Sequence, residues 1–114
     1  MPTLYGIANC DTVKKARSWL DEQHIACVFH DYRKAGIEAV QLQHWCTELG
    51  HEQLLNRRGT TWRQLPESER ADTSAAGSLR LMLAHPALIK RPLLDAGTVL
   101  LLGFDPARWR AALL

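Results

Sequence analysis

The sequence has little of three features that would each suggest a protein class: paired cysteines, long apolar runs and net charge. Its 114 residues contain three cysteines, Cys10, Cys27 and Cys46, and no two of them have the Cys-x-x-Cys spacing. An odd number of cysteines without that spacing argues against a disulfide framework and against a zinc knuckle. We therefore expect free thiols, and the functional question is whether one of them is reactive.

The apolar and charged residues exclude other classes of protein. The longest strongly apolar run, 98–102, is far shorter than the roughly 20 residues that span a bilayer. The N-terminus lacks the basic and long apolar regions of a secretory signal. Fourteen Lys and Arg against twelve Asp and Glu leave a charge of +2, which is too small a bias to indicate nucleic-acid binding. The five histidines lack metal-ligand spacing. We expect a cytoplasmic protein without a membrane or nucleic-acid partner and without a metal.

The first third of the chain is typical of a β-α-β unit. Residues 3–7 predict a short strand, and Val13, Ala16 and Leu20 then follow helical spacing. Capping-type side chains place the start of this helix within a residue or two of Cys10. Residues 25–32 alternate and are rich in β-formers, which predicts a second strand. A crossover of this length implies two parallel strands with a helix on the sheet.

The remaining pattern predicts a helical block followed by a β-β-α unit. Asp105 is expected to cap the last helix, with Pro106 in its first turn. The sequence therefore predicts one thioredoxin-like α/β domain over 1–114, with a helical insertion at about 36–86. The expected elements are a helix in 36–50, a short helix or turn in 53–56, a basic loop in 57–63, a helix in 66–84 and antiparallel strands at 88–94 and 98–102.

Cys10 is the best candidate for a nucleophile because it lies where the first strand ends and the first helix begins. Unpaired N–H groups and the positive end of the helix dipole favour a thiolate there. The alternative is that Cys10 is a small packed side chain, which is how we interpret Cys27 and Cys46. Position 13, where a dithiol oxidoreductase would carry its second cysteine, is Val13. A mixed disulfide at Cys10 would therefore need an external thiol.

Basic residues elsewhere are candidates for anion binding. In this topology a proline that opens the third strand faces the first helix, so Pro92 would place the preceding Arg91 near Cys10. Arg57 and Arg58 form a second group, whose guanidinium forks suit oxyanions or carboxylates. Each group also has the simpler interpretation of a solvated surface charge. The same holds for Lys14 and Lys15 in the first helix.

Three separated segments resemble the ArsC/Spx family, and specifically its YffB-type subgroup. They are 4–16 with Cys10, 56–62 with the Arg-Gly-Thr-Thr-Trp sequence, and 89–94 with Arg-Pro-Leu. The resemblance implies a thioredoxin-like fold with a helical insert and one nucleophilic cysteine assisted by arginines. It also implies that glutathione and glutaredoxin resolve the intermediate. By the same resemblance Cys10 is catalytic, and the residues expected to bind substrate or glutathione are Arg58, Arg91, Pro92, Asn9 and Arg57.

Two departures from the family pattern shape the functional hypotheses. No arginine follows Gly97-Thr98, where glutaredoxin-coupled arsenate reductases have one, and Val13 breaks the Cys-x-x-Cys switch of many Spx regulators. The departures weaken arsenate reduction and motivate a non-catalytic alternative. The single helix-terminal Cys10 without an internal partner leads us to expect a monomeric glutathione-dependent thiol reductase with glutathione as co-substrate and no tightly bound cofactor. A non-catalytic Spx-like module that binds a partner such as RNA polymerase is the alternative, and arsenate reduction is a third hypothesis.

Overall fold

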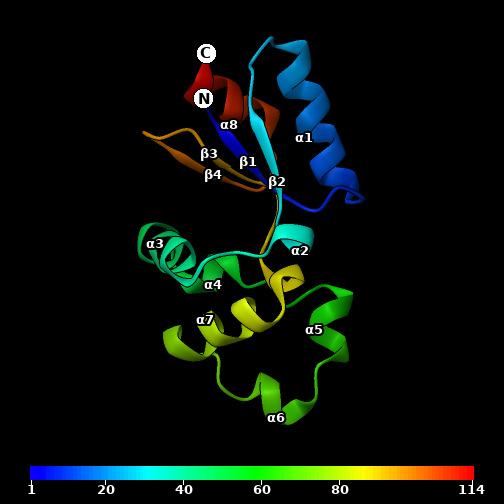
Figure 1. Ribbon diagram of the computed structural model, residues 1–114, viewed down its shortest axis with the longest axis vertical. Coiled ribbons are helices and arrows are strands. Elements are labelled where there is room, and N and C mark those ends of the chain that lie inside the picture. Colours follow the sequence, from blue (N-terminus) through cyan, green and yellow to red (C-terminus); the bar gives the residue numbers. More distant parts are fainter. The chain divides into compact units, whose positions relative to one another are not determined.

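The computed structural model describes all residues from Met1 to Leu114. None of its helices is both long enough and apolar enough to cross a membrane. In chain order the elements are β1 (Thr3–Gly6), α1 (Asp11–Glu22), β2 (Val28–Asp31), α2 (Tyr32–Ala35), α3 (Ala39–Leu49), α4 (His51–Leu54), α5 (Thr60–Gln64), α6 (Glu67–Arg70), α7 (Ala75–Ala84), the 3₁₀ helix η1 (Pro86–Leu88), β3 (Leu93–Asp95), β4 (Leu100–Leu102) and α8 (Pro106–Leu113) (Figure 1).

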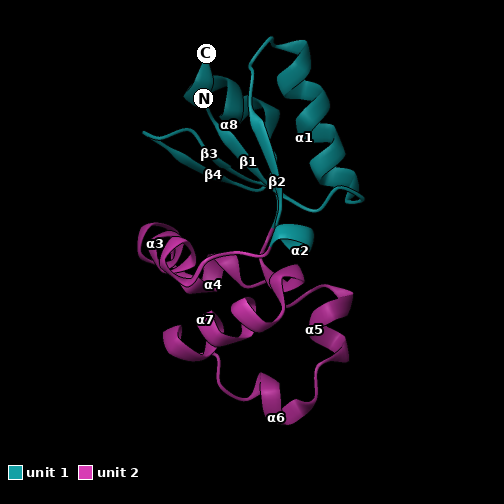
Figure 2. Cartoon of the chain, in the orientation of Figure 1, with its two compact units in different colours: residues 1–35, 91–114 teal, residues 36–90 magenta.

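The chain divides into two compact units (Figure 2). The first unit is made of residues 1–35 and 91–114 and contains the whole sheet. The second is the continuous segment 36–90, which contains only helices apart from one isolated bridge between Leu55 and Ile89. The helical insertion predicted at about 36–86 thus corresponds to a unit that ends four residues later.

The sheet of the first unit has the thioredoxin-like order β2-β1-β3-β4. Strands β1 and β2 are parallel, with Thr3 opposite Val28, and this confirms the predicted β-α-β unit. Strand β3 runs antiparallel to both β1 and β4. Because β1 is central, the loop that follows it lies at the carboxyl edge of the sheet, where ligands collect in open α/β folds.

One face of this sheet is covered by α1 and α8. The core cluster joins them to three strands and consists of Leu4, Ala16, Leu20, Leu94, Leu101 and Trp109. The Trp109 ring meets Trp19 and Phe104 edge-on, with centroids 6.2 and 5.0 Å away. Full burial of one such apolar side chain stabilises the fold by roughly 1.5–3 kcal/mol. This packing fixes α1, and therefore its N-terminus, against the sheet.

Gly6 allows the first turn of α1 to approach β1 closely. A Cβ atom at this position would lie only 2.7 Å from Cγ2 of Val13, which is fully buried. Real carbon atoms do not pack at that distance, so any side chain at residue 6 would push the turn away. Gly6 therefore sets the position of the helix N-terminus that follows Cys10.

The second unit has buried side chains of its own. Its largest fully buried residues are Trp45, Leu42, Leu54, Met82, Leu88 and Ile89. Helix α7 begins at Ser74, whose hydroxyl accepts a hydrogen bond from the N–H of Gly77 at 3.1 Å. The carboxylate of Asp72 accepts from the Ser74 N–H at 3.1 Å and pairs with Arg80 at 2.8 Å. Local hydrogen bonds thus organise the turn before α7.

Several predicted boundaries were wrong, and the clearest are at β2 and β3. Strand β2 starts at Val28 rather than residue 25, and it ends at Asp31 because the Asp31 carboxylate accepts the N–H groups of Arg33 and Lys34 and starts α2. The strand predicted at 88–94 is instead η1 followed by β3. Its first residues belong to the second unit, where the Lys90 N–H donates to the carbonyl of Leu54 at 2.7 Å.

The helical predictions also need correction. The segment 57–63 is not entirely a loop, because helix α5 begins at Thr60 with Gly59 as its N-cap. The region 66–84 contains two helices, α6 and α7, because the turn at Asp72 interrupts the helical path. The last helix matches its prediction, with Asp105 as N-cap and Pro106 in the first turn.

Candidate active site around Cys10

The backbone holds Cys10 at the N-cap of α1. After β1 the chain turns, and the N–H of Cys10 donates to the carbonyl of Ile7 at 3.1 Å. The Cys10 carbonyl then accepts the N–H of Lys14 at 2.9 Å as the first helical hydrogen bond. Its φ and ψ of −87° and 127° are extended, as is usual for a cap. The predicted position of Cys10 at a helix N-terminus is therefore the observed one.

The surroundings of Cys10 favour a thiolate. Partial burial is the largest single influence on its pKa and raises it, but the groups that lower the pKa outweigh burial together. These are the N–H groups of Val13 and Thr12 and the guanidinium of Arg91. The sulfur forms no capping hydrogen bond of ordinary geometry. We therefore attribute the lowered pKa to the combined field of the helix end and Arg91.

Arg91 reaches Cys10 because of where β3 begins. Strand β3 lies beside β1, with Leu93 opposite Tyr5, so the residues just before it meet the end of β1. The Arg91–Pro92 peptide bond is cis, and Pro92 is buried. The Pro92 carbonyl accepts the N–H of Gly103 at 2.8 Å. The sequence prediction placed Arg91 beside Cys10, and the structure does the same.

Asp31 ties the Cys10 loop to the next strand. Its Oδ2 accepts the N–H of Ala8 at 3.1 Å, while its Oδ1 accepts the N–H of Arg33 at 2.9 Å. Burial raises the pKa of this carboxyl, but the donated backbone hydrogen bonds outweigh burial, and the net pKa is lowered. Asp31 thus stays ionised and holds the loop that carries Cys10.

Tyr32 directly follows Asp31 in the chain and is fully buried. Burial is the main cause that raises the pKa of its phenol, and the charges of Arg91 and Cys10 also act on it. Sequence analysis missed both Asp31 and Tyr32. The only sequence signal for them is their place at the carboxyl end of the second parallel strand, next to the end of the first.

The remaining predicted residues fall into two groups. Asn9 is exposed in the turn before Cys10. Arg57 and Arg58 belong to the second unit and are exposed. The Arg57 guanidinium lies 5.7 Å from the centre of the Trp62 ring. The Arg58 N–H donates to Oδ1 of Asn56 at 3.0 Å. Within the first unit, the structure thus brings together Cys10, Asn9, Arg91 and Pro92.

The other two thiols differ from Cys10. All three cysteines are free, and burial raises the pKa of both Cys27 and Cys46. Cys27 precedes β2, whereas Cys10 follows the parallel strand β1, so they lie at opposite ends of the sheet. Four residues of strand separate those ends by roughly 13 Å. A disulfide needs Cα atoms within about 7 Å, so Cys27 is not placed to pair with Cys10.

Comparison with known proteins gives consistent results. The chain matches the ArsC family over residues 5–112. A solved structure described as the YffB protein is 50% identical, covers 100% of both chains and superposes with a TM-score of 0.96. An arsenate reductase (ArsC) related protein from Brucella melitensis is 49% identical over 96% of this chain and 92% of that one, with a TM-score of 0.77.

The relatives found by sequence include a protein without a functional name and transcriptional regulators. A Haemophilus influenzae protein without a functional name is 40% identical over 98% of both chains. The global transcriptional regulator Spx of Streptococcus pneumoniae is 26% identical over 99% of this chain and 86% of its own length. The fold, the full-length match and the helix-terminal cysteine agree with the family resemblance seen in the sequence. This chain belongs to the ArsC family and is of the YffB type, with Spx regulators among its more distant relatives.

Proposed function

We propose that this protein is a glutathione-dependent thiol reductase that uses Cys10 as its nucleophile. One observation carries the proposal: Cys10 lies at a helix N-terminus with a lowered pKa beside Arg91, and no other cysteine of the first unit lies within disulfide distance. A lowered pKa increases the fraction of Cys10 that is present as the attacking thiolate at a given pH. Because the first unit offers Cys10 no cysteine partner, the proposed turnover uses an external thiol.

The reaction consists of two thiol–disulfide exchanges. The Cys10 thiolate attacks one sulfur of a substrate disulfide and forms a mixed disulfide, while the second sulfur leaves as a thiolate and takes a proton from water. An external thiolate then attacks the mixed disulfide, which releases the Cys10 thiolate and forms a new disulfide. Glutathione supplies the external thiol, alone or through glutaredoxin, and is oxidised as the substrate is reduced.

The groups around Cys10 have separate tasks in this scheme. Arg91 and the N–H groups of Thr12 and Val13 stabilise the thiolate both before attack and when it leaves again. Backbone atoms beside Pro92 are available to pair with the peptide of glutathione. Asp31 keeps the loop in place through the Ala8 N–H.

The proposal is tested by incubating the protein with oxidised glutathione and locating the adduct by mass spectrometry. We expect glutathione on Cys10 alone, and we expect the Cys10→Ser variant to lose both the adduct and disulfide reduction in an assay with glutathione and glutaredoxin. Cys27→Ser and Cys46→Ser are the matched controls and should behave like wild type. An adduct on Cys27 or Cys46, or activity retained by Cys10→Ser, would contradict the proposal.

A second candidate function is a non-catalytic regulator that binds RNA polymerase. It is supported by the relatives named Spx, which match nearly the whole chain. Direct binding of the purified protein to purified RNA polymerase tests it. If this is the function, Cys10→Ser should bind as well as wild type, and the wild-type protein should show no turnover with any disulfide.

Arsenate reduction is a third candidate, supported by the description of the Brucella melitensis structure as related to arsenate reductase. Against it, residues 99–102 contain no arginine after Gly97 and Thr98. An assay with arsenate, glutathione and glutaredoxin tests this candidate. Arsenate turnover comparable to disulfide turnover would make arsenate the preferred substrate.

A further inference from the structure

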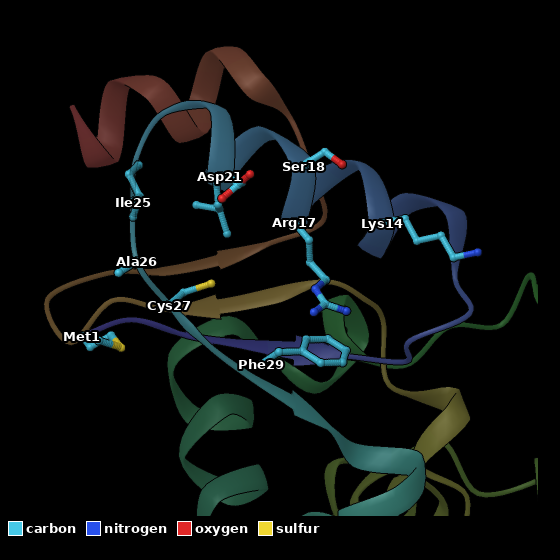
Figure 3. Close-up of a pocket in the computed structure, with 10 residues that line it drawn as sticks. Met1, Lys14, Arg17, Ser18, Asp21, Ile25, Ala26, Cys27 and Phe29 are labelled. Atoms are coloured by element: carbon cyan, nitrogen blue, oxygen red, sulfur yellow. The ribbon is translucent and has the colours of Figure 1, made fainter.

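A hollow of about 750 Å³ lies between α1 and β2 in the first unit (Figure 3). Helix α1 contributes Lys14, Arg17, Ser18 and Asp21 to its wall. Cys27, just before β2, and Phe29, within β2, contribute to the opposite wall. The hollow is therefore built entirely from the β-α-β unit that carries Cys10.

The cations of the hollow have no carboxylate partner in this chain. Lys14 and Arg17 are exposed, and neither forms an ion pair. Asp21 is one helical turn beyond Arg17 on the same wall, yet the Arg17 guanidinium lies over the Phe29 ring instead, 4.2 Å from its centre. Figure 3 shows this side chain extended from α1 toward Phe29. The ring face holds the guanidinium in the hollow by a cation–π contact and leaves its N–H groups available to an anion.

These cations follow Cys10 along one side of the helix. At 100° per residue, positions 10, 14 and 17 fall within about 60° of one another. At 1.5 Å per residue, Arg17 is about 10 Å farther along the axis than Cys10. A fully extended tripeptide spans at most about 10–11 Å. A substrate of two or three residues with its sulfur at one end therefore spans the distance from Cys10 to Arg17. Where the sulfur is on the middle residue, the long Lys14 and Arg17 side chains cover the rest of the distance, because helical side chains lean toward the N-terminus of the helix.

We propose that this hollow binds the carboxylate end of a short, anionic, thiol-containing peptide while its sulfur exchanges with Cys10. The inference rests on the proposed function, because it takes Cys10 as the nucleophile and names the substrate class that this site prefers. Lys14 and Arg17 attract the carboxylates, and Phe29 fixes the orientation of Arg17. Cys27 also lines the hollow but is the weaker nucleophile, because burial outweighs the nearby charge of Arg17 and raises the pKa of its thiol.

The test compares an anionic with a neutral disulfide on the full-length protein. Second-order rate constants for mixed-disulfide formation are measured with oxidised glutathione and with bis(2-hydroxyethyl) disulfide. For the Lys14→Ala/Arg17→Ala double variant we expect about a tenfold slower reaction with oxidised glutathione, since contacts between exposed charges are individually weak and two of them are removed. The rate of the double variant with the neutral disulfide should stay within about twofold of the wild-type rate. The difference between variant and wild type with oxidised glutathione should shrink in high salt.

Lys15→Ala is the matched control. It removes the same charge from the neighbouring position, which is exposed but does not line the hollow. Two results would overturn the proposed subsite. One is that Lys14→Ala and Lys15→Ala slow the reaction with oxidised glutathione equally, and the other is that the double variant slows the reactions with both disulfides equally. In that case Cys10 would still react in all variants, so the proposed function would stand. If wild type reacts with neither disulfide, the proposed function itself fails.

Discussion

The two units of this protein show how the same residue type acquires different chemistry. Cys10 in the first unit and Cys46 in the second are both partly buried, and in both burial raises the pKa. For Cys46, on the side of α3, nothing opposes that effect. For Cys10 the N–H groups of a helix end and Arg91 reverse it. The direction of the pKa shift is therefore set by the helix end and Arg91, not by burial.

The units also differ in how they are held together. The first unit depends on contacts between distant parts of the chain, since β1 pairs with both β2 and β3 and α8 packs near α1. The second is a continuous segment whose helices are mostly four to eleven residues long. Only long-range pairing can bring Arg91 to Cys10, because 81 residues of sequence separate them. The site thus belongs to the unit with the non-local topology.

The largest expected effect comes from removing the Arg91 side chain. This change tests whether the Cys10 thiolate depends on the guanidinium that strand pairing brings beside it. A hydrogen bond to a charged group contributes about 1.5–3 kcal/mol, so Arg91→Ala should slow mixed-disulfide formation at pH 6 by about 10- to 100-fold. The sign follows from the lowered pKa: the thiolate is lost as pH falls, and the variant loses it at a higher pH than wild type. Thiolate absorbance against pH, measured alongside the rates, checks both statements.

Arg57→Ala and Arg58→Ala in the second unit are the controls for this experiment. Neither residue is among the groups that lower the Cys10 pKa. We expect both variants to keep the wild-type thiolate titration, whatever they do to substrate affinity. A shift of the Cys10 titration in Arg58→Ala as large as that in Arg91→Ala would show that the second unit also controls the thiol.

Substitutions of two glycines, one in each unit, distinguish an effect on the stability of the protein from an effect on the geometry of the Cys10 site. A Cβ at Gly6 would lie 2.7 Å from Cγ2 of Val13, and one at Gly77 would overlap the carbonyl oxygen of Asp72. Overpacking of this kind costs about 1–3 kcal/mol, so Gly6→Ala and Gly77→Ala should both lower the free energy of unfolding, measured with urea. Only Gly6→Ala should also raise the Cys10 pKa, because it displaces the first turn of α1. Unchanged thiol titration in Gly6→Ala would contradict this account.

Local patterns in the sequence predicted some elements of the first unit and misplaced others. Strand β1, the start of α1 near Cys10 and the Asp105 cap of α8 each follow from short-range signals, and all three are found. The β3 region could not be placed, because the apolar residues Leu88 and Ile89 suggest a strand while tertiary contacts assign them to η1 and the second unit. An apolar run indicates burial but does not specify which core receives it.

The site was predictable only where a motif marked it. Cys10 and Arg91 could be named from their positions relative to a strand and a helix. Asp31 could not, because its link to the Cys10 loop is one hydrogen bond accepted from the N–H of Ala8, 23 positions away. The contact of Arg17 with Phe29 depends on the packing of α1 against β2 and leaves no short-range pattern. Contacts between distant segments become visible only once the fold is known.

The smallest expected effect compares the two side-chain helix caps. The Asp105 carboxylate accepts the N–H of Ala107 at 3.1 Å in the first unit, and the Ser74 hydroxyl accepts that of Gly77 at 3.1 Å in the second. Loss of a cap costs typically about 1 kcal/mol, so Asp105→Ala and Ser74→Ala should destabilise the protein by similar amounts if both units unfold together.

Hydrogen exchange measured by mass spectrometry distinguishes joint from separate unfolding. If the units unfold together, either variant should speed global exchange in both units by about fivefold, the factor that 1 kcal/mol corresponds to. Faster exchange confined to 36–90 in Ser74→Ala, and to 1–35 and 91–114 in Asp105→Ala, would show two independent folding units. The Cys10 site would then persist while the second unit is open, because Cys10, Arg91 and Asp31 all lie in the first.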